Sequence, residues 1–98
     1  MINMNEAEKA TARLLEVMET LRRECPWDRE QTFDSLRNNT IEEVYELADA
    51  ITDKNMEGIK EELGDLLLHV AFYSKLGDEQ GAFNYTDVAN GVCDKLIY

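Results

Sequence analysis

The sequence predicts an all-α fold, a four-helix bundle-like domain completed by dimerisation. Apolar residues recur at steps of three and four along most of the chain, which is the spacing of amphipathic helices. No segment shows the alternation of a half-buried strand. The only proline, Pro26, marks the first break in the helical pattern. A chain of 98 residues is at most one ordinary small domain, so we expect a single domain over residues 1–98.

The first predicted helix spans residues 5–24, where apolar positions such as Leu14 and Leu21 alternate with charged ones. Residues 25–31 then interrupt the pattern and predict a structured loop or a short turn of helix. The second helix ends near residue 52, and its start is open. Thr40-x-x-Glu43 resembles a capping box, whereas Phe33 and Leu36 fit an earlier start.

The third predicted helix has Asn55 as its N-cap and ends near Leu76, with Gly77 as its C-cap. Residues 66–72 of this helix are apolar all round, which predicts burial on more than one side. A four-helix monomer of this length cannot cover such a helix, so we expect a symmetric homodimer or a higher oligomer. Thr86 is the expected N-cap of a fourth helix.

Charge and composition exclude several classes of protein. There are 21 acidic and 10 basic residues, a net charge of −11, which disfavours binding to duplex nucleic acid. The uncharged run over residues 66–74 is far shorter than the ~20 residues of a membrane span, so we expect no membrane association. Two cysteines without metal-like spacing predict reduced thiols, and hence a cytoplasmic location.

Acidic side chains at helical spacing are the main candidates for chemistry. Glu43 and Glu46 are three residues apart, as are Glu62 and Asp65, so each pair shares a helix face at a cost in stability. Basic partners are scarce in both segments, and a divalent cation, Mg²⁺ or alternatively Mn²⁺, is the simplest charge partner left. The alternative is a solvated face without a ligand. We prefer that alternative for four other acids: Glu42, when judged by spacing alone, and Asp49, Glu57 and Glu61.

Two blocks of sequence resemble the MazG family of nucleotide pyrophosphohydrolases. The first is Cys25-Pro26-Trp27-Asp28-x-x-Gln31-Thr32, followed by Ser35-Leu36-Arg37. The second is Glu42-Glu43-x-x-Glu46 followed by Glu61-Glu62-Leu63-Gly64-Asp65, which is similar to the family's metal motif. The order and spacing of both blocks are shared, and the resemblance extends from about residue 14 to residue 97.

The resemblance implies an all-α, dimeric, Mg²⁺-dependent enzyme that hydrolyses nucleoside triphosphates to the monophosphate and pyrophosphate through a metal-activated water. By motif position it implies four metal ligands: Glu43, Glu46, Glu62 and Asp65. It also implies catalytic roles for Glu42 and Glu43, and a phosphate contact for Lys95. The family continues past this position with a basic residue and a His-Pro-His run, so we expect a MazG-like domain truncated at its C-terminal end.

Several side chains keep two interpretations. Trp27 could stack on a nucleobase, although packing is the preferred interpretation, and Arg37 could contact a phosphate or form a surface ion pair. His69 shares the face of Glu62 and Asp65, where a hydrogen-bonded core histidine is preferred over a metal ligand. Tyr45 and Tyr73 are expected in the core or at an interface. The alternative function for the whole chain is a non-catalytic acidic helical module for dimerisation or as an adaptor.

Overall fold

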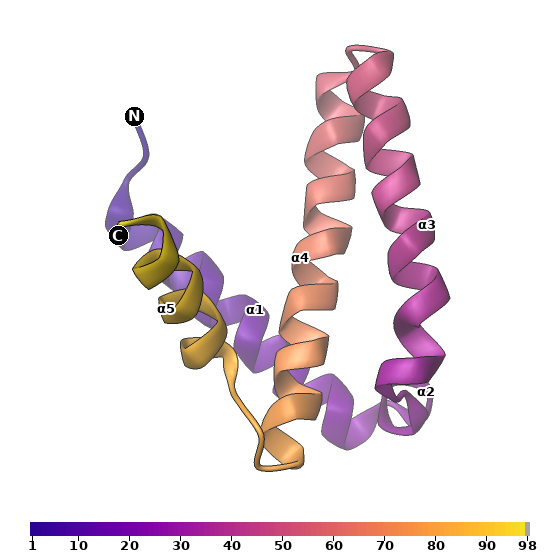
Figure 1. Ribbon diagram of the computed structural model, residues 1–98, viewed down its shortest axis with the longest axis vertical. Helices are drawn as coiled ribbons and strands as arrows, with labels where there is room; N and C mark the ends of the chain where they lie inside the picture. Colours follow the sequence, from indigo (N-terminus) through magenta and orange to yellow (C-terminus); the bar gives the residue numbers. More distant parts are fainter. Residues whose placement is uncertain (98) are drawn as a thin grey trace. The chain divides into compact units, whose positions relative to one another are not determined.

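The structure is a computed structural model that describes residues 1–97, and these residues form helices and connecting turns without a strand. The predicted all-α class is therefore confirmed. The chain divides into two compact units, Met1–Gln31 and a second that begins at Thr32. The first contains α1 (Met4–Glu24) and α2 (Pro26–Glu30); the second contains α3 (Phe33–Thr52), α4 (Met56–Glu79) and α5 (Tyr85–Leu96) (Figure 1).

In the first unit, α1 begins where the side chain of Asn3 accepts a hydrogen bond from the backbone N–H of Glu6. Pro26 then opens α2, a position where its missing N–H costs nothing. Arg22 Nη1 lies 2.6 Å from the carbonyl oxygen of Asp28, and 2.8 and 3.0 Å from those of Arg29 and Gln31. The guanidinium of Arg22 therefore caps the C-terminal end of this short helix. Because Pro26–Glu30 is helical, the interpretation of this segment as a short turn of helix is confirmed.

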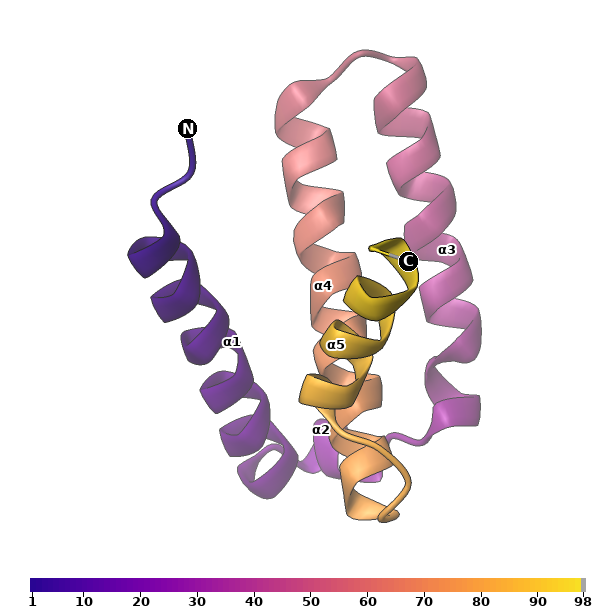
Figure 2. The same cartoon turned by 60° about the vertical axis from the view of Figure 1, so that its left-hand side comes forward.

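The second unit is built on an antiparallel hairpin of α3 and α4, which lie side by side in both views (Figures 1 and 2). Its register can be followed from one end to the other. The ring of Phe33 stacks on that of Tyr73 with centroids 5.7 Å apart, and Thr40 meets His69 midway. Near the turn, a Cβ on Gly58 would lie 3.4 Å from the Cβ of Ala50. The buried side chains of this unit include Leu36, Phe72 and Leu76.

The start of α3 decides between the two interpretations of the second predicted helix. Thr32 and Ser35 form a reciprocal capping box, in which each side chain accepts from the other's backbone N–H. The earlier start at Phe33 is therefore correct and the Thr40 box is wrong. Thr40 lies inside the helix, and its hydroxyl donates to the carbonyl of Leu36.

The end of α4 differs from the prediction, because the helix runs past Gly77 to Glu79. The N–H of Ala82 bonds to the carbonyl of Gly77, and the N–H of Gly81 bonds to that of Asp78. Together with a φ of +68° at Gly81, these bonds form a Schellman motif, so Gly81 is the terminating glycine. Gly77 is glycine for another reason: a Cβ there would lie 2.5 Å from Cζ of Phe83.

The start of α5 also differs from the prediction. Its N-cap is Asn84, which forms a capping box with Asp87, and not Thr86. The helix contacts α4 (Figure 2). The large apolar side chains of this segment are exposed, from 38% at Val88 to 82% at Ile97.

The apolar segment of α4 is not buried all round in the single chain. His69, Ala71 and Phe72 are buried, whereas Leu67 keeps 48% and Val70 39% of their surface. In the single chain α4 packs against α3 and α5, so the predicted burial on more than one side is seen only in part. No helix within residues 1–97 combines the length and the hydropathy that a membrane span requires.

Candidate functional site

Three carboxylates converge between α3 and α4. Glu43 on α3 and Glu62 and Asp65 on α4 each offer an oxygen, and these oxygens all lie within 4.8 Å of one another. The antiparallel register places the middle of α3 opposite the middle of α4, and the three-residue step puts Glu62 and Asp65 on one face. We call these three residues the carboxylate cluster. Glu43 and Glu62 are half-buried, and Asp65 is exposed at the edge.

Two oxygens of the cluster are buried without a hydrogen-bond donor. They are Oε2 of Glu43 and Oε2 of Glu62. An ionised carboxylate only accepts hydrogen bonds, so the two groups cannot satisfy each other unless a proton or a cation lies between them. Buried polar atoms without a partner are rare in folded proteins, and each needs an explanation.

The electrostatics of the site favour a proton or a cation. Burial raises the pKa of Glu43; its contact with Glu62 acts in the opposite direction, and the charges of Asp65 and Glu46 raise the pKa further. Burial likewise raises the pKa of Glu62, and its contact with Glu43 acts in the same direction. For Glu46 the largest cause of its raised pKa is the charge of Glu62. All three glutamates therefore resist ionisation in the absence of a positive partner.

No lysine or arginine among residues 1–97 contributes to these shifts. Lys60 is the nearest basic residue in sequence to Glu62, and its Nζ lies 2.9 Å from Oε2 of Glu57. The donor set is made only of carboxylate oxygens, which suits a hard divalent cation such as Mg²⁺. The residues therefore fit a metal ion.

Glu46 and Glu42 complete the predicted acidic motif without joining the tight group. Glu46 is exposed and lies close enough for its charge and that of Glu62 to affect each other. Glu42 is also exposed, and its charge raises the pKa of Glu46. These two residues form the outer edge of the acidic site.

The family model of the MazG nucleotide pyrophosphohydrolase domain matches residues 31–98. This chain belongs to the MazG family. It is 44% identical over 87 residues to the nucleoside triphosphate pyrophosphohydrolase of Escherichia coli K12, covering 86% of this chain and 33% of that protein. It is 47% identical over 96 residues to the nucleoside triphosphate pyrophosphohydrolase/pyrophosphatase MazG of Thermotoga maritima, covering 96% of this chain and 38% of that protein. The chain thus spans only about a third of the length of these curated relatives.

The fold is shared with a solved member of the family. A crystal structure of a MazG-related protein from Thermotoga maritima matches with a TM-score of 0.76 at 25% identity, over 87% of this chain and 75% of that one. The predicted family resemblance is therefore confirmed by sequence and by fold.

The predicted substrate contacts of this MazG chain lie outside the carboxylate cluster. Arg37 is exposed on α3, and its Nη1 lies 3.3 Å from Oδ1 of Asn38. Lys95 is exposed on α5. Trp27 lies in the first unit with 59% of its surface exposed. Tyr45, expected in the core or at an interface, keeps 69% of its surface exposed in the single chain.

Sequence reasoning missed a hydrogen-bonded network beside the cluster. Thr40 Oγ1 lies 2.5 Å from Nδ1 of His69 and 2.5 Å from the hydroxyl of Tyr73. His69 is buried, so the preferred interpretation as a hydrogen-bonded core histidine is confirmed. The available signal was the four-residue step from Asp65 to His69 and on to Tyr73, which places all three on one face of α4.

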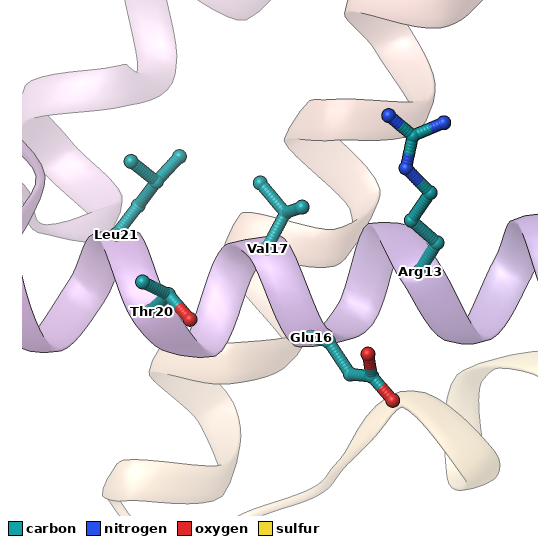
Figure 3. A pocket seen from close by; sticks show the side chains of 5 residues that line it. All are labelled: Arg13, Glu16, Val17, Thr20 and Leu21. Atoms are coloured by element: carbon teal, nitrogen blue, oxygen red, sulfur yellow. The ribbon is translucent and has the colours of Figure 1, made fainter.

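A separate hollow of about 290 Å³ lies on α1 (Figure 3). Its lining comes from this one helix, and consists of Arg13, Glu16, Val17, Thr20 and Leu21. Its lining includes one basic and one acidic side chain, which point in different directions (Figure 3), without the convergent polar groups of a ligand site. The carboxylate cluster is therefore the candidate site of the MazG chain.

Proposed function

We propose that this chain hydrolyses nucleoside triphosphates to the monophosphate and pyrophosphate with the help of a divalent cation, Mg²⁺ or Mn²⁺. The observation that carries the proposal is the convergence of Glu43, Glu62 and Asp65 within 4.8 Å, with two buried oxygens that lack a donor. Membership of the MazG family and the names of its curated relatives support the same activity. They favour an enzyme over an acidic adaptor module.

The proposed ligands are the carboxylate cluster together with Glu46. When bound, a divalent ion offsets the charge of the triphosphate and lowers the pKa of a water. The chain itself supplies oxygen ligands on two helices, which hold their spacing better than a loop would. This arrangement also explains how a protein of net charge −11 could bind a polyanion.

The reaction needs an acceptor for the proton of the attacking water. The water oxygen forms a bond to the α-phosphorus, and the bond from that phosphorus to the oxygen bridging to the β-phosphate breaks. We assign the catalytic roles to Glu42 and Glu43. A carboxylate can accept that proton; Glu43 lies in the carboxylate cluster, and Glu42 is exposed next to it in sequence.

Arg37, Lys95 and Trp27 are the proposed substrate contacts. Arginine and lysine suit phosphate oxygens, and an exposed tryptophan can stack on a base. All three are exposed, so none is engaged in packing that would prevent such a contact.

We also propose a homodimer or a higher oligomer, because the second unit leaves large apolar side chains uncovered. On α3, Val44 is 50% and Tyr45 69% exposed, and on α4 Leu63 is 51% and Leu67 48% exposed. Extended apolar surface of this kind is typical of an interaction site. Sedimentation should give a mass above that of a monomer for the wild type, and Leu67→Glu should return a monomer. A compact wild-type monomer at micromolar concentration would contradict this part of the proposal.

The test of the activity is a panel of nucleoside and deoxynucleoside triphosphates incubated with the chain and Mg²⁺. Pyrophosphate and the monophosphate should appear in equal amounts, and a chelator or Glu43→Gln should abolish their release. Glu61→Gln is the matched control, because Glu61 is an exposed acid outside the cluster. Release of orthophosphate in place of pyrophosphate, or no release from any nucleotide, would refute the proposed reaction.

A further inference from the structure

The hydrogen bonds around Thr40 define the proton positions of a small network. Its Oγ1 has three neighbours: the carbonyl oxygen of Leu36 at 3.1 Å, Nδ1 of His69 and the hydroxyl of Tyr73. A threonine hydroxyl carries one proton and two lone pairs. The Leu36 carbonyl can only accept, so the proton of Thr40 goes to it. His69 and Tyr73 must then both donate to Thr40, which places a proton on Nδ1 of His69.

The ring packing around this network restricts its geometry. The ring of Tyr73 is stacked on Phe33, with an angle of 5° between their planes, and meets the His69 ring edge-on at 68°. Phe33 in turn lies 6.5 Å from Phe83, centroid to centroid. The Tyr73 ring therefore lies between those of Phe33 and His69, and the hydrogen bonds tie α3 to α4.

The network lies one helical turn from the carboxylate cluster on both helices. On α3, Thr40 precedes Glu43 by three residues, and on α4 His69 follows Asp65 by four. Residues at these spacings share a helix face. The network and the cluster thus occupy successive levels of the same helix pair. Carboxylates of like charge repel, so a fixed separation of the helix backbones at the neighbouring level limits how far they can move apart.

We propose that the Thr40–His69–Tyr73 network is a positioning device for the carboxylate cluster, with Nδ1–H of His69 as its central donor. The inference rests on the proposed function, because it concerns the metal ligands of that reaction. His69 acts through the helix pair and not as a ligand, since its nitrogens lie outside the group of converging metal-ligand atoms.

The state of the imidazole agrees with this geometry. Burial lowers the pKa of His69, while the charge of Asp65 acts in the opposite direction. Burial is the larger effect, so the ring is neutral at pH 7 and above. A neutral ring carries a single proton, and the network places that proton on Nδ1.

The first test measures the tautomer directly. His69 is the only histidine of the chain, so ¹⁵N-labelled protein gives a single imidazole spectrum. At pH 7.5 we expect a protonated Nδ1 and an unprotonated Nε2 in the wild type. In Thr40→Val we expect the proton to move to Nε2, the preferred tautomer in water, and Thr40→Ser should restore Nδ1–H. A wild-type ring protonated on Nε2 would overturn the assignment.

The second test measures positioning in folded protein. Partners that orient metal ligands typically contribute 10–100-fold to metal affinity, so we expect Thr40→Val and Tyr73→Phe to bind Mn²⁺ about tenfold more weakly, at the low end of that range. At saturating metal, kcat should fall while KM for the nucleotide stays near the wild-type value. Ser74→Ala is the matched control, because it removes a buried hydroxyl that bonds only within α4.

The outcomes separate the two proposals. Wild-type affinity and kcat in both network variants, in a chain that does bind Mn²⁺ and hydrolyse nucleotides, would overturn the positioning role alone. A wild-type chain that binds no Mn²⁺ would refute the proposed function, and the positioning role with it. Equal losses in Ser74→Ala would reduce the network to a general contribution to stability.

Discussion

Removing one charge from the carboxylate cluster should change stability in opposite directions with and without metal. In the metal-free protein, Glu62→Gln removes a group whose pKa is raised by burial and by its contact with Glu43. The amide carries no charge to desolvate, so the variant should melt at a higher temperature than the wild type in a chelator. With Mg²⁺ present the order should reverse, because the variant has lost a ligand oxygen.

The size of the reversal can be worked out by mass action. A ligand at one hundred times its Kd stabilises the folded state by about 2.7 kcal/mol. For a domain of about 60–100 residues, 1 kcal/mol corresponds to roughly 4–8 °C in Tm. Saturating Mg²⁺ should therefore raise the Tm of the wild type by about 10–20 °C, and that of Glu62→Gln by only a few degrees.

The assay is thermal unfolding followed by circular dichroism, first in chelator and then across a Mg²⁺ titration. Glu61→Gln is the control, since it removes the same charge from the adjacent, exposed position on α4. It should leave the response to Mg²⁺ close to that of the wild type. If Glu62→Gln and Glu61→Gln respond to Mg²⁺ alike, the cluster is only an acidic surface, and the reasoning from converging oxygens fails.

Three further outcomes follow from other contacts. In metal-free protein, the free energy of unfolding should fall as the pH rises above 4.5 and through the raised pKa of Glu43. In this range the folded state still holds a proton on Glu43 that the unfolded state has lost. Urea titrations from pH 4 to pH 7 measure this slope. Gly77→Ala should lower the Tm by several degrees. Overpacking against Phe83 costs about 1–3 kcal/mol, which outweighs the gain of about 1 kcal/mol in helix propensity. Phe83→Leu in the same chain should reverse the loss. Arg22→Met should destabilise the first unit by about 2 kcal/mol and speed hydrogen exchange in α2, because hydrogen bonds from a charged donor to three carbonyls are lost.

The sequence carried enough information to place the acidic site. Each of two consecutive helices carries two acids three residues apart, on one face of the helix. Antiparallel pairing of these helices is enough to bring the acids close together. The structure brings Glu43, Glu62 and Asp65 together as expected, with Glu46 beside them. Spacing along the chain decides which face of a helix a residue occupies, and that face decides the partners.

The helix ends were harder to predict, because short-range signals compete there. Gly77 and Gly81 are both plausible terminators by local rules, and the contact that decides between them involves Phe83, whose ring occupies the space above Gly77. The start of α3 is set by a different, local signal: Thr32 and Ser35 cap each other's backbone, which leaves Thr40 inside the helix. At the end of α4, a contact formed only in the folded chain accompanies the choice between the two glycines.

The carboxylate cluster lies between two levels at which α3 and α4 are in contact. The carboxylates on their own favour separation of α3 and α4, yet two levels of close contact flank them. On one side, the hydroxyl of Thr40 joins the helices through His69. On the other, near the turn, the helices are again in contact, since a Cβ on Gly58 would lie 3.4 Å from the Cβ of Ala50. Packing on both sides holds the repelling carboxylates together, so the site is preorganised for a cation. This is the physical reason to expect the metal affinity and the metal-free stability to change in opposite directions.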